Sequence, residues 1–222
     1  SVHELMHSWY QGVLGFNESL YSWMDEGFTS YASADVMNYL KQQKLIPGIF
    51  EENPQLSSVR EYINFAKSGY EELMNTHADH FSTNAAYNVA SYVKGSVFLE
   101  ELKYIIGEES FNKGMLRFFN TWKFKHPNDN DFIRIMEKVS GMELDWFKEY
   151  FVNSTRTIDY EIEEMRGREL ILRRVGLMPM PLDITVKLKD GTTKQYYVPI
   201  DLMRATKPGD KYFNTFKTIH PW

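Results

Sequence analysis

The sequence predicts a mainly α-helical chain that ends in a small β module. Helical periodicity with start and stop signals extends over most of residues 1–155, whereas residues 156–222 carry clustered or alternating β-forming residues and a turn signal. With 222 residues, of which 43% are hydrophobic, the chain can bury a sizeable core. We therefore expect a helical domain over residues 1–155 and a small β domain over residues 156–222, the start of a β-sandwich-like module.

The helical segments are separated by breakers and capping signals. A long helix is predicted from Ser19 to Lys44, before the breaker Pro47-Gly48, and a second helix begins at the capping box Ser58-x-x-Glu61. A third runs from Thr83 to Gly107. Shorter helices are predicted over residues 109–122, 129–139 and 143–152, and the last of them opens at the capping box Ser140-x-x-Glu143.

The strands of the β module follow from β-forming residues and one turn. We predict strands over residues 160–165, 169–175, 184–188 and 194–198. Asp190-Gly191 lies between the last two and is a strong hairpin signal.

An H-E-x-x-H motif formed by His3, Glu4 and His7 lies near the N-terminus, and Glu26 follows His7 after eighteen intervening residues. Residues four apart share one face of a helix, so His3 and His7 can bind one cation while Glu4 faces the open side. Catalytic zinc takes three protein ligands and leaves a position for water, and a buried carboxylate such as Glu26 needs a compensating partner. We predict one zinc ion bound by these two histidines and Glu26.

This set of residues predicts amide hydrolysis without a covalent intermediate. Bound zinc lowers the pKa of its water to about 7 and polarises the substrate carbonyl. Glu4, which is not a ligand, would take the proton of the water and pass it to the leaving amine. The alternative interpretation of the motif is a solvated helix face without a metal.

The residues around the motif resemble a known family. His3 to Trp9 and Trp23 to Phe28 are similar to the H-E-x-x-H-x-W and W-L-N-E-G-F patterns of the aminopeptidase N and leukotriene hydrolase family of gluzincin zinc metallopeptidases. Asp25 stands where the family usually has Asn, a polar residue of similar size. The resemblance covers residues 1–155, fits bacterial members best, and implies the helical half of a thermolysin-like catalytic domain.

A second match lies downstream of the metal motif. Tyr92-Val93-Lys94-Gly95 resembles the Y-x-K-G segment of the family, whose tyrosine hydroxyl stabilises the oxyanion of the tetrahedral intermediate. The resemblance implies this catalytic role for Tyr92 and a supporting place for Tyr87.

The resemblance implies a zinc-dependent aminopeptidase that releases N-terminal residues from peptides. In the family, N-terminal domains precede the zinc helix and carry a G-x-M-E-N segment that binds the free amino group of the substrate. Only two residues precede His3 here. We therefore expect a C-terminal piece of a longer enzyme, with an uncapped first helix, weak zinc binding and near-background activity by itself, and with the missing N-terminal domains of the same protein as its partner.

Two other functions stay open on the sequence alone. One is a non-catalytic fragment or binding module, and the other is an epoxide hydrolase or a different peptide specificity on the same zinc site. His77 and His80 flank Asp79, and we expect a surface loop there in preference to a second metal site.

Composition limits the remaining classes. A formal net charge of −5 argues against a nucleic-acid partner. The sequence contains no run of 18 apolar residues, so no membrane span is expected, and the absence of cysteine rules out disulfides. The compartment stays open, with periplasm, cell envelope and cytoplasm all compatible with the sequence.

Overall fold

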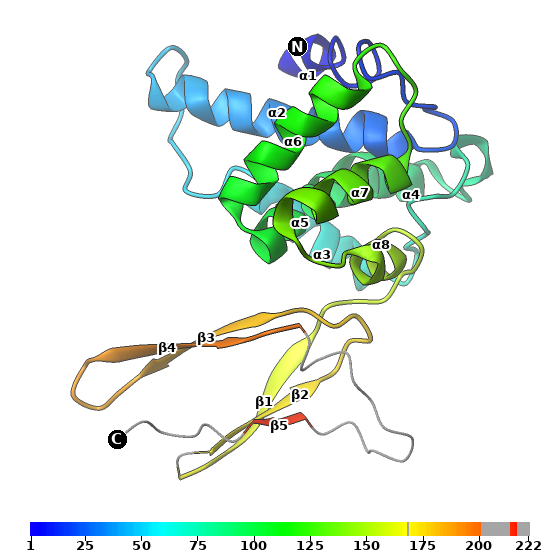
Figure 1. Cartoon of the computed structure of the whole chain (residues 1–222). Helices are drawn as coiled ribbons and strands as arrows, with labels where there is room; N and C mark the ends of the chain where they lie inside the picture. The colour runs from blue at the N-terminus through cyan, green and yellow to red at the C-terminus, as the bar shows by residue number, and fades with distance from the viewer. Residues whose placement is uncertain (168, 201–213, 217–222) are drawn as a thin grey trace. The chain divides into compact units, whose positions relative to one another are not determined.

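The chain divides into a helical unit and a β unit (Figure 1). The computed structural model describes residues 1–167, 169–200 and 214–216, with backbone alone for the last three. Ser1–Thr155 forms the first compact unit and Arg156–Trp222 the second. All helices lie in the first unit and all strands in the second among the described residues, so the predicted fold class, mainly α with a small β module, is confirmed. The parts of the β domain predicted over residues 201–213 and 217–222 lie outside the described residues.

The helical unit is built around the packing of two helices, α2 and α5. Helix α2 packs against α5 and the adjoining π turn η2, and α6 packs against α7. The helical elements are α1 (Val2–Met6), α2 (Ser22–Gln42), α3 (Leu56–Ala66), η1 (Ala78–His80), α4 (Asn84–Asn88), η2 (Val89–Val93), α5 (Lys94–Ile106), α6 (Glu108–Trp122), α7 (Asp129–Ser140) and α8 (Asp145–Phe151). The single helix predicted over residues 83–107 is thus three consecutive pieces, α4, η2 and α5. None of the helices within the described ranges is long and apolar enough to cross a membrane.

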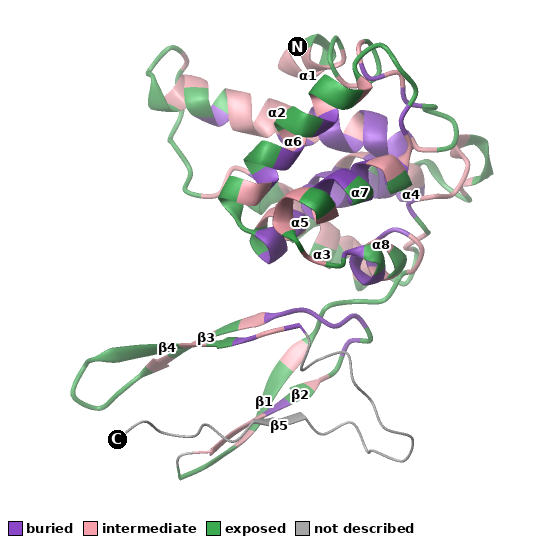
Figure 2. Cartoon of the chain, in the orientation of Figure 1, coloured by how far each residue is buried: buried purple, intermediate pink, exposed green. Residues whose placement is uncertain are grey.

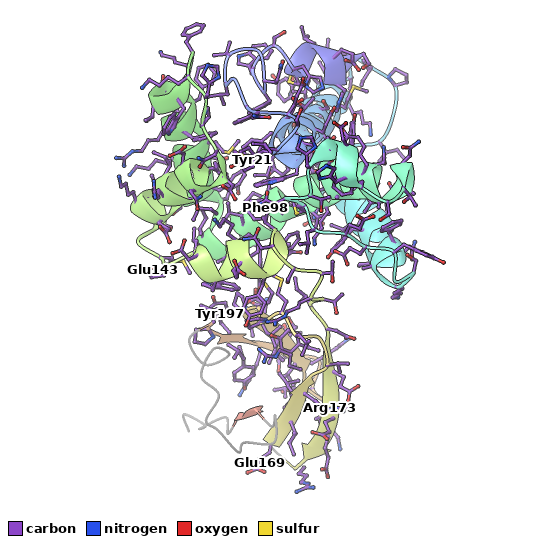
Figure 3. The ribbon with its side chains drawn as sticks, turned by 90° about the vertical axis from the view of Figure 1, so that its right-hand side faces the viewer. Tyr21, Phe98, Glu143, Glu169, Arg173 and Tyr197 are labelled. Carbon is purple, nitrogen blue, oxygen red and sulfur yellow. The ribbon has the colours of Figure 1, made fainter. Side chains whose placement is uncertain are left out.

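An aromatic core fills the space between these helices. The ring of Phe98 on α5 stacks on Phe147 of α8 and meets Trp23 of α2 edge to face, with both pairs of ring centroids 4.9 Å apart. Figure 2 shows that α2 is buried mainly along its N-terminal half, and Figure 3 shows Phe98 among the side chains of the helical unit. Burial of each such ring stabilises the fold by roughly 1.5–3 kcal/mol. The fully buried aromatic side chains include Trp23, Phe28, Phe98, Phe118, Phe132, Phe147 and Phe151.

The predicted start of the second helix is wrong by two residues. Helix α3 begins at Leu56, and Gln55 before it makes no side-chain cap. The Gln55 side chain is buried, where its amide donates to the Tyr31 carbonyl (3.1 Å) and its oxygen accepts from the Ser96 hydroxyl (2.6 Å). Tertiary hydrogen bonds of Gln55, and not a capping box at Ser58, therefore accompany the start of α3.

The capping box predicted at Ser140 is also wrong. Ser140 ends α7, where its hydroxyl donates to the Met136 carbonyl (2.8 Å), and α8 begins at Asp145 without a side-chain cap. The capping box observed lies at the other end of α7. There Asn128 Oδ1 accepts from the Asp131 backbone N–H (3.2 Å) and Asp131 Oδ2 accepts from the Asn128 N–H (3.1 Å).

The β unit contains two small antiparallel sheets. Strand β2 pairs with both β1 and β5 in one sheet, and β3 pairs with β4 in the other. The predicted hairpin is confirmed: Asp190 Oδ1 accepts from the Thr192 backbone N–H (2.9 Å), and Gly191 has a positive φ of 88°. The strands are β1 (Tyr160–Arg166), β2 (Glu169–Arg174), β3 (Leu182–Lys187), β4 (Thr193–Val198) and β5 (Asn214–Phe216).

Replacing Glu101 on α5 by Gln is expected to stabilise the chain above neutral pH. Burial raises the pKa of Glu101 from its ordinary 4.5 to about 7, and the neighbouring Glu100 carboxylate adds to the rise. A raised folded-state pKa gives stability that is complete below the unfolded pKa and is lost as pH rises through the folded pKa. Gln carries no charge at any pH, so Glu101→Gln should be more stable by about 1–3 kcal/mol at about pH 8 and little changed at about pH 5.

Urea unfolding at the two pH values measures this difference. Glu109→Gln is the control, because Glu109 is exposed on α6. If the free energy of unfolding changed equally with pH in Glu101→Gln and in the parent chain, the Glu101 carboxyl group would not have the raised pKa.

Candidate active site

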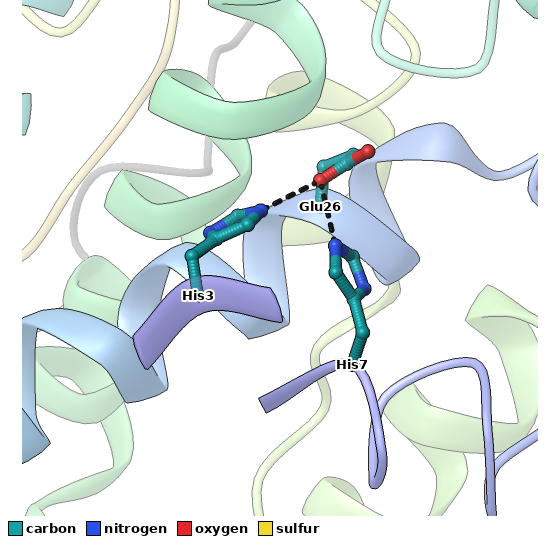
Figure 4. A group of neighbouring side chains, drawn as sticks. All are labelled: His3, His7 and Glu26. Atoms are coloured by element: carbon teal, nitrogen blue, oxygen red, sulfur yellow. Dashed lines mark hydrogen bonds and ion pairs between the residues drawn. The ribbon is translucent and has the colours of Figure 1, made fainter. Parts of the chain in front are cut away.

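Three side chains from two helices meet at one point of the helical unit (Figure 4). Glu26 Oε2 on α2 lies 3.1 Å from His3 Nε2 and 3.3 Å from His7 Nε2. His7 follows the last residue of α1 and keeps right-handed helical angles, with its N–H bonded to the His3 carbonyl (3.2 Å), so both imidazoles stay on one face. The structure therefore brings together the three residues that the sequence predicted as ligands.

Helix α1 is capped, contrary to the prediction. The Ser1 hydroxyl accepts from the backbone N–H of Glu4 at 3.5 Å. The Glu4 side chain is exposed on this helix and is outside the cluster of His3, His7 and Glu26.

The donor atoms of this cluster lie within 4.8 Å of one another and could hold a metal ion. Ligand atoms at about 2.0–2.1 Å from a tetrahedral zinc lie about 3.3 Å from one another. The two separations from Glu26 Oε2, 3.1 and 3.3 Å, are close to this value. Asp25 Oδ1 is buried beside the cluster, has no hydrogen bond of ordinary geometry among the described residues, and forms an ion pair with His7 Nδ1 at 2.9 Å.

The second ring nitrogen of His7 is surrounded by three oxygens. Nδ1 lies 2.9 Å from Asp25 Oδ1, 3.2 Å from Thr29 Oγ1 and 3.3 Å from the Tyr10 carbonyl oxygen. Burial lowers the pKa of His7, but the Asp25 carboxylate, the Tyr10 carbonyl and Glu26 outweigh it, and the pKa of His7 is raised. Burial raises the pKa of Asp25 to about 6 against the opposing effect of His7.

The sequence pattern predicted no role for Thr29, and it indicated Asp25 only as a polar replacement of similar size for the usual Asn. A signal was present, since Asp25 and Thr29 are four residues apart in a helix and so share a face. That face could be recognised as the one toward His7 only when α1 was placed against α2.

Tyr92 comes to the cluster from the π turn η2. Its ring stacks on His3, with centroids 5.7 Å apart and planes 20° apart. Burial, with the hydrogen bond to Glu26 next, raises the pKa of Tyr92, so its hydroxyl keeps the proton and can donate it in a hydrogen bond. The ring of Tyr87 lies edge-on to that of Tyr92, with ring centroids 6.3 Å apart. π turns are rare and frequently lie at functional sites.

Two glycines set the close approach of α2 to the segment that carries Tyr92. A Cβ atom on Gly27 would lie 2.7 Å from Gly95 Cα, and one on Gly95 would lie 2.8 Å from Gly27 Cα. Gly27 directly follows Glu26, and Gly95 lies three residues after Tyr92. Any side chain at either position would push the two backbones apart.

His77 and His80 lie near each other but do not form a metal cluster. Their ring centroids are 4.9 Å apart, and His77 Nδ1 accepts from the Asp79 backbone N–H at 3.2 Å. Among the residues that the structure describes, the group of three or more potential ligands is His3, His7 and Glu26.

His3, His7 and Glu26 form a group that could hold one metal ion, with the spacing of the H-E-x-x-H motif. Residues 1–151 match the model of the peptidase family M1 domain. The chain belongs to peptidase family M1, and the predicted resemblance to the aminopeptidase N family is confirmed.

The relatives and solved structures agree with this assignment. The glutamyl aminopeptidase of Bitis rhinoceros is 24% identical over 247 residues, covering 99% of this chain and 24% of that protein. A probable aminopeptidase 1 of Sulfurisphaera tokodaii is 23% identical, covering 64% of this chain and 18% of that protein. The chain thus spans about a quarter or less of the length of these curated relatives.

Two solved structures share the fold. One is the aminopeptidase A of Legionella pneumophila in complex with aspartic acid, with a TM-score of 0.59, 20% identity, and coverage of 88% of this chain and 22% of that chain. The other is the M1 zinc metallopeptidase of Deinococcus radiodurans, with a TM-score of 0.54, 16% identity, and coverage of 71% and 33%.

Proposed function

We propose that this chain carries the metal-binding part of the active site of a zinc aminopeptidase. The observation that supports this most strongly is the meeting of His3, His7 and Glu26 within a peptidase family M1 domain, with both histidine nitrogens 3.1–3.3 Å from Glu26 Oε2, near the separation of ligands on a tetrahedral zinc. The aminopeptidase names of its relatives support the choice of substrate, a peptide cleaved at its N-terminal bond.

In this proposal, the bound zinc, Glu4 and Tyr92 would each have a separate role in hydrolysis of the peptide bond. Bound zinc would lower the pKa of a water molecule to about 7 and polarise the carbonyl of the scissile bond. Glu4, exposed on α1 between the two histidines in the sequence, would accept a proton from the attacking water and transfer it to the leaving amine. Tyr92, whose hydroxyl stays protonated, would donate a hydrogen bond to the carbonyl oxygen as negative charge develops there.

Replacing Glu26 by Ala is expected to weaken zinc binding by more than about 100-fold. Loss of outer-shell partners alone typically costs about 10- to 100-fold in metal affinity, and Glu26 would be a direct ligand. The zinc dissociation constant of the 222-residue chain, measured by competition with a chromogenic chelator, tests this. Glu109→Ala serves as the control, because this exposed carboxylate lies on α6 and outside the cluster. Equal zinc affinity in the Glu26→Ala variant and the parent chain would refute the ligand assignment.

The type of reaction is tested on the full-length gene product, because this chain spans 18 to 24% of the relatives' length. Hydrolysis of aminoacyl anilides, lost on removal of zinc and restored by its return, is the expected result. Turnover of an epoxide without turnover of any aminoacyl anilide would favour an epoxide hydrolase, and turnover of neither by the zinc-loaded protein would favour a binding module.

A further inference from the structure

We propose that Asp25 is a positioning residue that holds His7 for the metal through the Nδ1 atom of the imidazole. This inference rests on the proposed zinc site and adds to it a residue that is not itself a ligand. Asp25 Oδ1 lies 2.9 Å from His7 Nδ1, the shortest of the three oxygen contacts of that nitrogen.

The orientation of the His7 ring assigns separate tasks to its two nitrogens. Nε2 faces the cluster, 3.3 Å from Glu26 Oε2, and Nδ1 faces away from it toward Asp25. An imidazole that binds a metal through Nε2 carries its proton on Nδ1, and that proton needs an acceptor. A carboxylate acceptor fixes this tautomer and the direction of the ring, and it also makes the ring a stronger donor to the cation.

Asp25 is better suited to this task than the other two oxygens around Nδ1. It carries a negative charge that Thr29 and the Tyr10 carbonyl lack, and it is 4% exposed, so its interaction with the ring is screened little by water. Its Oδ1 atom has no hydrogen bond of ordinary geometry among the described residues, so the ion-pair contact with His7 Nδ1 at 2.9 Å is the polar interaction of this buried oxygen there. Thr29, one turn farther along α2, contacts the same nitrogen from the same helix face.

The position of Asp25 in the chain couples the two halves of the site. Asp25 directly precedes Glu26 on α2, so this helix supplies one ligand and also the contact that orients another ligand on α1. Helix α1 has only five residues and no buried residue, and short isolated helices are marginally stable. Contacts from α2 therefore contribute strongly to holding His7 in place.

The test compares metal binding by Asp25→Asn and Asp25→Ala with that of the parent chain. Asn keeps the size and one acceptor oxygen but removes the charge, and Ala removes both. We expect affinities for Zn²⁺ and Co²⁺ to fall by about 10-fold in Asp25→Asn and by about 10- to 100-fold in Asp25→Ala. The visible absorption bands of bound Co²⁺ should shift in both variants, because they report the ligand geometry around the metal.

Two controls separate this role from general damage to the fold. Asp35→Asn removes another half-buried carboxylate of α2, ten residues and about 15 Å along the helix, and should leave metal affinity unchanged. Urea unfolding of the metal-free chains should show Asp25→Asn to be at least as stable as the parent, since Asn avoids a buried charge. A purely structural role for Asp25 would instead lower stability and leave the Co²⁺ bands of the folded protein in place.

The outcomes distinguish this proposal from the zinc site on which it rests. Parent-like affinity and an unchanged Co²⁺ spectrum in Asp25→Ala, with metal binding lost in Glu26→Ala, would overturn the role of Asp25 and leave the zinc site standing. Metal affinity that is equal in Glu26→Ala and the parent would overturn the zinc site, and the role of Asp25 with it.

Discussion

Replacing Glu4 by Gln is expected to lower aminoacyl anilide hydrolysis by about 10²- to 10⁴-fold while zinc content stays the same, because the amide cannot accept a proton from the attacking water. Glu4 is exposed on α1, between the two histidines, and lies outside the group formed by His3, His7 and Glu26. Its removal should therefore affect proton transfer and not metal binding. The effect should fall on kcat, since a proton acceptor acts in the transition state and not in the binding of substrate.

Steady-state kinetics and zinc analysis of the full-length gene product measure both quantities. Glu109→Gln, the same chemical change on an exposed face of α6, controls for the loss of a surface charge. Retained turnover in Glu4→Gln would show that another group accepts the proton, and loss of zinc would show that Glu4 belongs to the ligand set.

Replacing Lys94 by Met is expected to destabilise the helical unit by about 3–5 kcal/mol, the cost of leaving a buried charge without its partner. The Lys94 and Glu71 side chains are only 1% and 6% exposed, and Lys94 Nζ lies 2.7 Å from Glu71 Oε1. Lys94 also donates to the Ser154 carbonyl (3.2 Å), and the rings of Tyr62 and Phe151 lie within 5.6 Å of its charge. Burial lowers the pKa of Lys94, and Glu71 opposes this change.

Urea unfolding of single and double variants separates the pair from general packing. Lys94→Met combined with Glu71→Gln should recover a large part of the stability, because neither buried charge is then left alone. Lys41→Met is the matched control: its ion pair with Glu51 is partly exposed at 3.7 Å, and such pairs contribute at most about 1 kcal/mol. A cost below about 1 kcal/mol for Lys94→Met would show that Glu71 finds another donor or becomes protonated in the fold.

The Lys94 network also bears on the site. Lys94 follows the π turn that carries Tyr92 by one residue, and Gly95 meets Gly27 directly after it. Lys94→Met is therefore expected to displace Tyr92 and so to lower the rate of hydrolysis, even under conditions where the chain remains folded.

Local sequence patterns correctly predicted those helices and strands whose start, stop or turn signals are supplied by neighbouring residues. The long helix ending before Pro47, the helix at residues 129–139 and the hairpin at Asp190-Gly191 all depend on breakers, periodicity or turn chemistry that neighbouring residues supply. Capping boxes proved less reliable. Ser58 and Ser140 both begin an S-x-x-E pattern. However, α3 begins directly after the buried Gln55, and the Ser140 hydroxyl donates to the Met136 carbonyl at the end of α7.

The sequence alone determined which residues are the candidate ligands: an H-E-x-x-H motif and a glutamate separated from it by eighteen residues predict a ligand set, because ligand chemistry and helical spacing are properties of the chain itself. Only the tertiary structure decided what surrounds these ligands. The π turn under Tyr92, the approach of Gly27 to Gly95 and the contact of Asp25 with His7 join residues far apart in the chain or depend on packing between helices. Such contacts arise when α2 packs against both α1 and α5, and no local pattern encodes which residues then meet.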